Sequence, residues 1–355
     1  MTPVIRPTFE IRSLVGVYAR EWLRYRRLLH ARGDAYLAIC NRHERLEAGP
    51  DDIGRRCMWR WTSELNAPKH VPRLGAALMR RALEDHPVRR ATTTPKGKDA
   101  PQVSFVIGHR GLGRLPHLLA TLESIAGQEG TQIECIVVEQ DDQAQLVSHL
   151  PAWIRHVHTP LPRPDLPFCR SWAFNVGVRH ARGAALILHD GDMLVPHDYA
   201  LHALRLLDKG FEVLNLKRFV FYLSKEHSGR IFDAQAGLTD SPPMSIIQNL
   251  EGGGSVAITR AGYEAIGGFD EAFVGWGGED VEFWERASSL RVWPYAFLPL
   301  VHVWHESQPE KEVHQSDTLR LYYELTQIPV AERIAKLRAA HRGRSYKAEA
   351  DDAAV

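Results

Sequence analysis

The stretch Ala184–Asp192 reads AALILHDGD and does most to decide the fold of this 355-residue chain. Its first part is a short apolar run of the kind that forms a buried β-strand. Its end places Asp190 and Asp192 on either side of a glycine, where such a strand meets solvent. Two aspartates that flank a glycine can form a plain turn. They can equally hold a divalent cation, because such ions accept carboxylate oxygens as ligands.

Two further apolar runs lie upstream, and each is followed by polar residues. Val103–Ile107 precedes His109 and Arg110, and Ile133–Val138 precedes Glu139. Helical spacing is found in Leu115–Ile125 and Phe174–Ala181. Strands that alternate with helices favour an α/β fold with a mostly parallel sheet covered on both faces. Because ligands bind at the carboxyl ends of such strands, the polar residues are candidates for one site.

The first hundred residues differ from the rest in charge and pattern. They hold 20 Lys and Arg against 11 Asp and Glu, whereas the remainder holds 24 against 32. Apolar residues three and four apart predict helices over residues 8–90. This basic surface is either solvated or a contact for a partner protein or an anionic membrane, and nucleic acid is not expected as a partner. We expect an arginine-rich helical region at 1–95, a linker at 96–101, the α/β domain at 102–310, and helices with a polar tail at 311–355.

Cysteine usage and hydropathy bear on the compartment. The four cysteines are widely spaced and include no CxxC pair, so we expect reduced, buried thiols. The N-terminal residues lack the apolar core of a signal peptide, and no stretch approaches the roughly 18 apolar residues of a membrane span. We therefore expect a cytoplasmic protein, with residues 1–95 as the candidate contact with the inner face of a membrane.

Two histidines make the DGD stretch more informative. His302 and His305 end another apolar run. A lone histidine there is often a core residue, but together with aspartates it favours Mn²⁺ over Mg²⁺, because imidazole is the softer ligand. If the run continues as a strand, its side chains alternate between faces, so we expect at most one of the two to bind the ion. Such an ion would neutralise a diphosphate as a sugar leaves it.

The segment Trp276–Asp280 reads WGGED and is the most specific pattern in the chain. Its glycines permit sharp turns, and the residues that follow start a helix whose dipole would stabilise ionised Asp280. A carboxylate there could act as a base, and Trp276 could support a sugar ring. Alternatively, Glu279 or Asp280 caps the helix. The glycine run Gly252–Gly254 either brings the backbone close to a ligand or forms a bend.

Longer stretches resemble a known group of enzymes. Residues 252–286, GGGSVAITRAGYEAIGGFDEAFVGWGGEDVEFWER, resemble the C-terminal portion of galactosyltransferase-type enzymes, which also occurs in chondroitin-polymerase-type members of glycosyltransferase family 2. Residues 105–142 are similar to the first strand–helix–strand of family 2 enzymes, and 170–177 to their helix before the DXD strand. Glu139-Gln140-Asp141 departs from their usual Asp-Asp-Gly. The resemblance spans roughly residues 101–307 and implies the GT-A fold.

The resemblance also implies how the donor would be bound. Asp192 would bind Mn²⁺ (or Mg²⁺) together with His305, and Asp190 would contact the ion or the ribose. The donor would be a UDP-sugar. Its nucleotide and diphosphate would lie among Arg110, Arg114, Glu139, Arg170, Asn175, Asp190 and Gly253.

On the acceptor side, the resemblance makes Asp280 the general base, with Glu279 and Trp276 contacting the acceptor. The expected activity is metal-dependent, inverting transfer of a hexose or N-acetylhexosamine to an acceptor hydroxyl. The acceptor would be a glycan, a lipid-linked saccharide or a peptide. Two alternatives stay open: a retaining GT-A enzyme similar to GalNAc transferases, and a non-catalytic nucleotide-sugar-binding or scaffold protein.

Overall fold

The computed structural model describes residues 14–41, 44–58, 62–94, 100–160, 166–306 and 310–342, and within them a seven-stranded mixed sheet forms the centre of the molecule. The strand order is β13-β9-β12-β7-β4-β5-β6. Neighbouring strands are parallel except at β12, which runs antiparallel to β7 and β9. The strands are β4 (Val103–His109), β5 (Ile133–Gln140), β6 (Arg155–Thr159), β7 (Ala185–His189), β9 (Val213–Leu214), β12 (Ser255–Thr259) and β13 (Val292–Trp293).

Helices cover both faces of this sheet, as the alternating strands and helices predict. Along β4, Phe105 and Ile107 point into one apolar cluster, and Val106 points into the other. Each fully buried side chain of this kind contributes about 1.5–3 kcal/mol. One face carries α5 (Leu115–Ala126) and α7 (Tyr199–Asp208), and the other carries α6 (Arg170–His180), α9 (Arg260–Ala265) and α10 (Glu279–Ala287). This mixed α/β architecture is that of a GT-A nucleotide-sugar transferase fold.

A second sheet, of five strands in the order β3-β11-β10-β14-β8, packs beside the first. β10 and β14 run parallel, and the other pairs are antiparallel. In β14, His302 pairs with Met193 of β8, so the end of β14 lies at the DGD turn. The strands are β3 (Ser63–Glu64), β8 (Met193–Leu194), β10 (Lys217–Tyr222), β11 (Ser245–Gln248) and β14 (Leu298–His302), and α8 (Lys225–Phe232) follows β10.

The N-terminal region is helical only in part. Helices are present as expected, but residues 46–57 form a two-stranded hairpin, which corrects the prediction of helices throughout 8–90. The hairpin closes where the Gly49 N–H donates to the Gly54 carbonyl, with Asp51 and Asp52 at positive φ between them. The elements are η1 (Val17–Glu21), α2 (Trp22–His30), η2 (Gly33–Ala38), β1 (Leu46–Ala48), η3 (Pro50–Asp52), β2 (Arg55–Cys57), α3 (Asn66–His70) and α4 (Pro72–Asp85).

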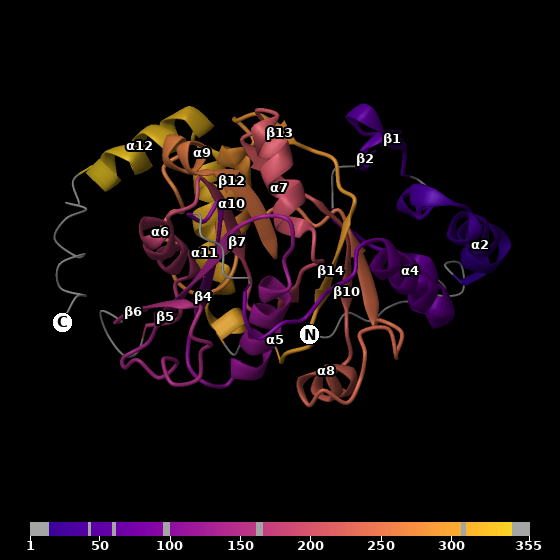
Figure 1. Cartoon of the computed structure of the whole chain (residues 1–355). Helices are drawn as coiled ribbons and strands as arrows, with labels where there is room; N and C mark the ends of the chain where they lie inside the picture. Colours follow the sequence, from indigo (N-terminus) through magenta and orange to yellow (C-terminus); the bar gives the residue numbers. More distant parts are fainter. Residues whose placement is uncertain are drawn as a thin grey trace.

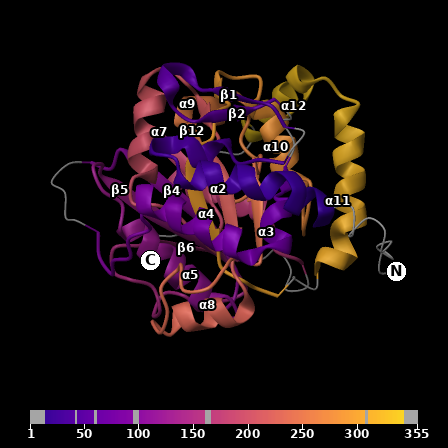
Figure 2. The same ribbon diagram turned by 90° about the vertical axis from the view of Figure 1, so that its right-hand side faces the viewer.

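Residues of the N-terminal region share a core with the sheets. Tyr25 and Leu78 belong to the same buried cluster as Phe221 of β10. The fully buried Arg218, also on β10, donates to the carbonyl oxygens of Leu37 and Ile39 at 2.9 and 2.7 Å. Figure 1 shows α2 and α4 on the side of the molecule that carries β10 and β14, and Figure 2 shows α2 and α4 from that side. Residues 96–99, most of the linker expected at 96–101, lie outside the described residues, as does residue 95.

The C-terminal helices support the opposite side of the molecule. α11 (Glu310–Thr326) and α12 (Val330–Arg342) follow the second sheet, and α12 lies across from α2 in Figure 1. Arg333 of α12 donates to Glu282 at 3.2 Å and to Glu285 at 2.9 Å, so α12 holds α10 in place.

The four cysteines are free and buried, as expected. Among the described residues, none of the helices has both the length and the hydropathy that a membrane span requires. The expected polar tail at 343–355 lies outside the described residues.

Candidate active site

The turn that links β7 to β8 carries both aspartates of the DGD stretch. β7 ends at His189, whose Nε2 lies 2.8 Å from the carbonyl oxygen of Met193 and closes the turn. Asp190 and Asp192 therefore leave the sheet at the carboxyl end of β7. This is the edge at which ligands bind in open α/β sheets.

Asp190 is tied to two other elements. Its Oδ1 accepts hydrogen bonds from Arg170 Nε and Nη2 at 2.9 and 2.6 Å, and its Oδ2 accepts one from the Gly254 N–H at 3.2 Å. Arg170 also reaches Glu279 at 3.4 Å and stacks over the Phe174 ring. Burial disfavours the guanidinium charge, yet the two carboxylates raise the pKa of Arg170 above its usual range. Arg170 is thus a fixed cation that joins the DGD turn to the WGGED segment.

Asp192 gathers two histidines, and we call the three residues the Asp192 group. Its Oδ2 lies 3.1 Å from His305 Nε2, and its Oδ1 lies 3.8 Å from His302 Nε2. The ligand atoms of all three residues lie within 4.8 Å of one another. Burial opposes ionisation of Asp192, but the hydrogen bond from His305 and the positive charges nearby hold the pKa of Asp192 well below its usual range. An ionised carboxylate beside two imidazoles suits a borderline divalent ion such as Mn²⁺.

Both histidines face Asp192, so the premise that the two side chains alternate along one strand is wrong. β14 ends at His302 and does not continue to His305. The Val303 N–H donates to the Asp192 carbonyl oxygen at 3.0 Å, and His305 then approaches from beyond the strand end. The alternation of strand side chains does not apply past that point. His302 itself stacks on Tyr222, with ring centroids 4.4 Å apart.

The contacts of this group leave metal-binding atoms available. His302 Nδ1 is buried without a hydrogen-bond partner in the described part of the chain, and its Nε2 is too far from Asp192 for a hydrogen bond. His305 Nδ1 lies 2.8 Å from the Glu306 carbonyl oxygen and 2.9 Å from Arg114 Nη2, and these two contacts require opposite tautomers. With the proton on Nδ1 donated to the carbonyl, Nε2 presents a lone pair toward Asp192, as metal ligation requires. A divalent cation therefore fits these residues.

The WGGED segment forms a tight loop that leads into α10. Gly277 and Gly278 have φ angles of +103° and +90°, in the left-handed region that glycine adopts most readily. The N-cap of α10 is Gly278, so neither Glu279 nor Asp280 takes the capping position. Both carboxylates instead lie in the first helical turn, where the helix dipole favours negative charge.

The glycine run at 252–254 packs against this turn. A Cβ atom at Gly253 would lie 2.8 Å from Asp280 Oδ2, so a side chain there would force the Asp280 carboxylate to shift. The neighbouring Gly254 is hydrogen-bonded to Asp190 through both its N–H and its carbonyl. The run is therefore a place of close backbone approach, and it connects Asp190 to Asp280.

Glu279 and Asp280 differ in their surroundings. Burial, followed by the charge of Asp280, raises the pKa of Glu279 to about 7 in spite of Arg170. Adjacent carboxyl groups in unequal environments are typical of acid–base sites. Trp276, at the start of the loop, keeps 38% of its surface exposed, as a platform for a sugar ring would require.

Two of the expected donor residues bond to other parts of the chain. Arg110 donates to the Leu166 carbonyl oxygen at 2.8 Å. Glu139 is fully buried and accepts hydrogen bonds from the Gln145 N–H at 2.7 Å and from His156 Nε2 at 2.7 Å. The contact between Glu139 and the uridine stays a prediction, and in this structure the carboxylate has internal partners. Its carboxylate shapes the loop after β5.

The other two expected donor residues differ, because Arg114 lies beside an acidic group of the site and Asn175 lies in the core. Arg114 is 3.5 Å from Asp192 Oδ2, so its guanidinium lies at the Asp192 group. Asn175 is buried, and it both donates to the carbonyl of Phe269 and accepts from the N–H of Phe269, each at 3.0 Å. Asn175 therefore holds the backbone at Phe269, in the loop that leads to the WGGED segment.

One residue near the site was missed from the sequence. Lys217 is fully buried on β10, and its Nζ donates to the Ser255 carbonyl oxygen. Burial lowers the pKa of Lys217 to about 7, although the charges of Asp190 and Asp280 act in the other direction. A lysine inside the apolar run of residues 213–222 was the available signal, because a charge in a buried strand requires partners.

Comparison with known proteins adds to this geometry. Residues 244–294 match a family described as the N-terminal domain of galactosyltransferase. Over 155 residues the chain is 28% identical to beta-1,4-galactosyltransferase 5 of Danio rerio. The matched region covers 39% of this chain and 34% of that protein. The chain thus spans about a third of the length of this curated relative. The family match contains the glycine run and the WGGED segment, and the two similarities together support a glycosyltransferase.

Proposed function

We propose that the protein is a metal-dependent, inverting glycosyltransferase that moves a hexose or N-acetylhexosamine from a UDP-sugar to an acceptor hydroxyl. The observation that carries this proposal is the meeting of three separate segments at one sheet edge. The DGD turn contacts His305 directly, Arg170 bridges it to Glu279, and the glycine run links it to Asp280.

The Asp192 group would hold the cation. Two imidazoles with one carboxylate favour Mn²⁺ over Mg²⁺. When bound, such an ion supplies Lewis-acid stabilisation of the charge that develops on the diphosphate. Arg114 lies at the same group, so its guanidinium is placed to neutralise a further phosphate oxygen.

Asp280 is proposed as the base, with Glu279 in a supporting role. The base must be ionised before reaction, and Glu279, with its pKa near 7, is partly protonated at neutral pH. A protonated Glu279 can donate a hydrogen bond to the acceptor, while Asp280 takes the proton of the attacking hydroxyl. The acceptor oxygen then bonds to the anomeric carbon as the bond from that carbon to UDP breaks on the opposite face.

We propose a saccharide as the acceptor because of Trp276, which begins the loop that carries these carboxylates. Exposed Trp276 suits stacking with a saccharide, whether free, lipid-linked or on a peptide. The arginine-rich region at 1–95 is proposed to contact the acceptor or a partner protein. We further propose a cytoplasmic location for this activity.

A donor screen tests the proposal. Purified protein with Mn²⁺ is incubated with UDP-Gal, UDP-GalNAc, UDP-Glc, UDP-GlcNAc and UDP-GlcA, and UDP release is measured with and without EDTA. We expect one or two donors to release UDP and EDTA to stop the release. Release from none of them, or release that EDTA leaves unchanged, contradicts the proposal. NMR of the glycoside product then reads its anomeric configuration, and retention would exclude the inverting mechanism.

A further inference from the structure

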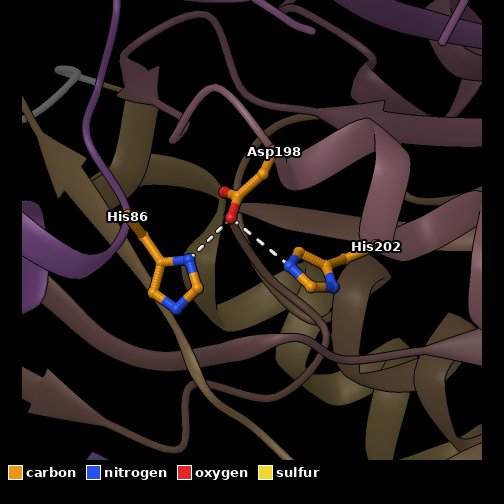
Figure 3. A group of neighbouring side chains, drawn as sticks. All are labelled: His86, Asp198 and His202. Atoms are coloured by element: carbon orange, nitrogen blue, oxygen red, sulfur yellow. Dashed lines mark hydrogen bonds and ion pairs between the residues drawn. The ribbon is translucent and has the colours of Figure 1, made fainter. Parts of the chain in front are cut away.

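A second group of one aspartate and two histidines lies where the N-terminal region meets the sheet, and we call it the Asp198 group. Figure 3 shows His86, the residue that follows α4, and Asp198 and His202, from the start of α7. The Phe297 ring lies against both imidazoles, with centroids 6.3 Å from His86 and 5.0 Å from His202. Phe297 precedes β14, whereas His302 ends it. At about 3.3 Å per residue the two groups are roughly 16 Å apart along that strand.

Three ligand atoms converge in this group. Asp198 Oδ2 lies 2.7 Å from His86 Nδ1 and 3.3 Å from His202 Nε2 (Figure 3). The three atoms lie within 4.8 Å of one another. The other carboxylate oxygen, Asp198 Oδ1, is buried without a hydrogen-bond partner in the described part of the chain. Side-chain exposures of 16–27% leave the group accessible from solvent.

We propose that the Asp198 group binds a Zn²⁺ ion. Two imidazole nitrogens and one carboxylate oxygen form a ligand set typical of zinc, with the fourth position left to water. Ligand atoms about 2.0–2.1 Å from a tetrahedral ion lie about 3.3 Å from one another. The separation between His202 and Asp198 already has this value, and the contact between His86 and Asp198 must open by about 0.6 Å to reach it.

Binding requires one change of protonation at each ring. In the metal-free arrangement Asp198 Oδ2 accepts from both near nitrogens. To coordinate the ion, each neutral imidazole must carry its proton on its remote nitrogen, His86 Nε2 or His202 Nδ1. The carboxylate needs no such change, because the two histidines outweigh burial and hold the pKa of Asp198 well below its usual range.

The bound ion would join two regions of the molecule. His86 closes α4 of the N-terminal region, and the other two ligands belong to α7, which packs on the seven-stranded sheet. The backbone already touches here, because the His197 N–H donates to the Pro87 carbonyl oxygen at 2.8 Å. An ion at this point stabilises the contact between the N-terminal region and the sheet, since it binds the folded state only.

The test counts zinc in the full chain with the Asp192 group removed. Metal-stripped Asp192→Ala protein is titrated with Zn²⁺ alone, and bound zinc is measured by equilibrium dialysis and mass spectrometry. We expect one equivalent of Zn²⁺ per chain, with a nitrogen and oxygen shell at about 2.0–2.1 Å by X-ray absorption. We also expect a rise in melting temperature with zinc concentration.

Two variants in the same background identify the ligands. Asp198→Asn keeps the size of the side chain, and His202→Gln keeps a helix-compatible residue in α7. We expect each to weaken zinc binding by more than about 10-fold and to abolish the rise in melting temperature. The control is His149→Ala, at an exposed loop position, which should leave the titration unchanged. Zinc binding that survives both ligand variants, or no zinc binding by a folded Asp192→Ala protein, overturns the proposal.

Discussion

The Asp192 group and the Asp198 group have the same composition but different neighbours. Arg114 lies beside Asp192, and the same turn leads through Asp190 and Arg170 to Glu279. Asp198 instead pairs with His86 and His202, and the Phe297 ring lies against both histidines. We therefore propose different roles for two similar ligand sets. The arginines and carboxylates around Asp192 suit an ion that binds a diphosphate near an acceptor, whereas the aromatic ring beside Asp198 suits a structural ion.

The largest expected effect is on transfer itself, at the proposed base Asp280. Asp280→Asn should lower the rate of transfer about 10²–10⁴-fold, the usual contribution of a general base. UDP binding should persist, because the amide keeps the size of the side chain. Steady-state kinetics and calorimetry with UDP and Mn²⁺ measure the two quantities. The matched control is Asp198→Asn, the same change of residue away from the proposed active site, and it should leave transfer unchanged. Normal transfer by Asp280→Asn would remove Asp280 from the mechanism.

A second substitution compares the two groups directly. Asp192→Ala should weaken Mn²⁺-dependent UDP binding by more than the roughly 10–100-fold that loss of an outer partner of a metal ligand costs. Asp198→Ala should leave UDP affinity within about twofold, since distant sites contribute independently. Calorimetry with UDP at saturating Mn²⁺ measures both. Equal losses in the two variants would mean that the groups are not separate in function.

The sequence predicts the parts of this picture that depend on local pattern. The apolar runs at β4, β5 and β7 identify the sheet, and the polar residues after β7 identify its ligand edge. The glycines of the WGGED segment indicate a turn that other residues adopt poorly, and the structure has φ angles of +103° and +90° there.

Tertiary contacts decide what the sequence leaves open. His302 and His305 read as alternating strand residues, but the strand ends at His302, where the chain bonds to Asp192. Glu139 reads as an open residue after a strand, but its carboxylate is buried and bonds to the partly buried His156. The Asp198 group brings His86 to a residue 112 positions away, a spacing that no local motif contains.

The raised pKa of Glu279 can be tested through the pH dependence of the free energy of unfolding, without a transfer assay. Burial and Asp280 raise its pKa from 4.5 to about 7 in the folded protein. The folded state therefore binds the proton more tightly, so this contribution to the free energy of unfolding is full below pH 4.5 and is lost as pH rises through 7. It amounts to at most about 3 kcal/mol. Denaturant unfolding of wild type and Glu279→Gln across this pH range measures the difference, and parallel curves would exclude a raised pKa.

The smallest effect tests the close approach that links Asp190 to Asp280. In Gly253→Ala the new Cβ would lie 2.8 Å from Asp280 Oδ2, and because φ at Gly253 is not positive, the side chain and not the backbone must shift. We expect roughly 10-fold slower transfer, less than the 10²-fold that a 1 Å misplacement can cost, with little change in melting temperature. The matched control is Gly113→Ala, where the Cβ meets nothing within 4 Å among the described residues. If both alanine variants transfer sugar at the wild-type rate, the contact with Gly253 does not position Asp280.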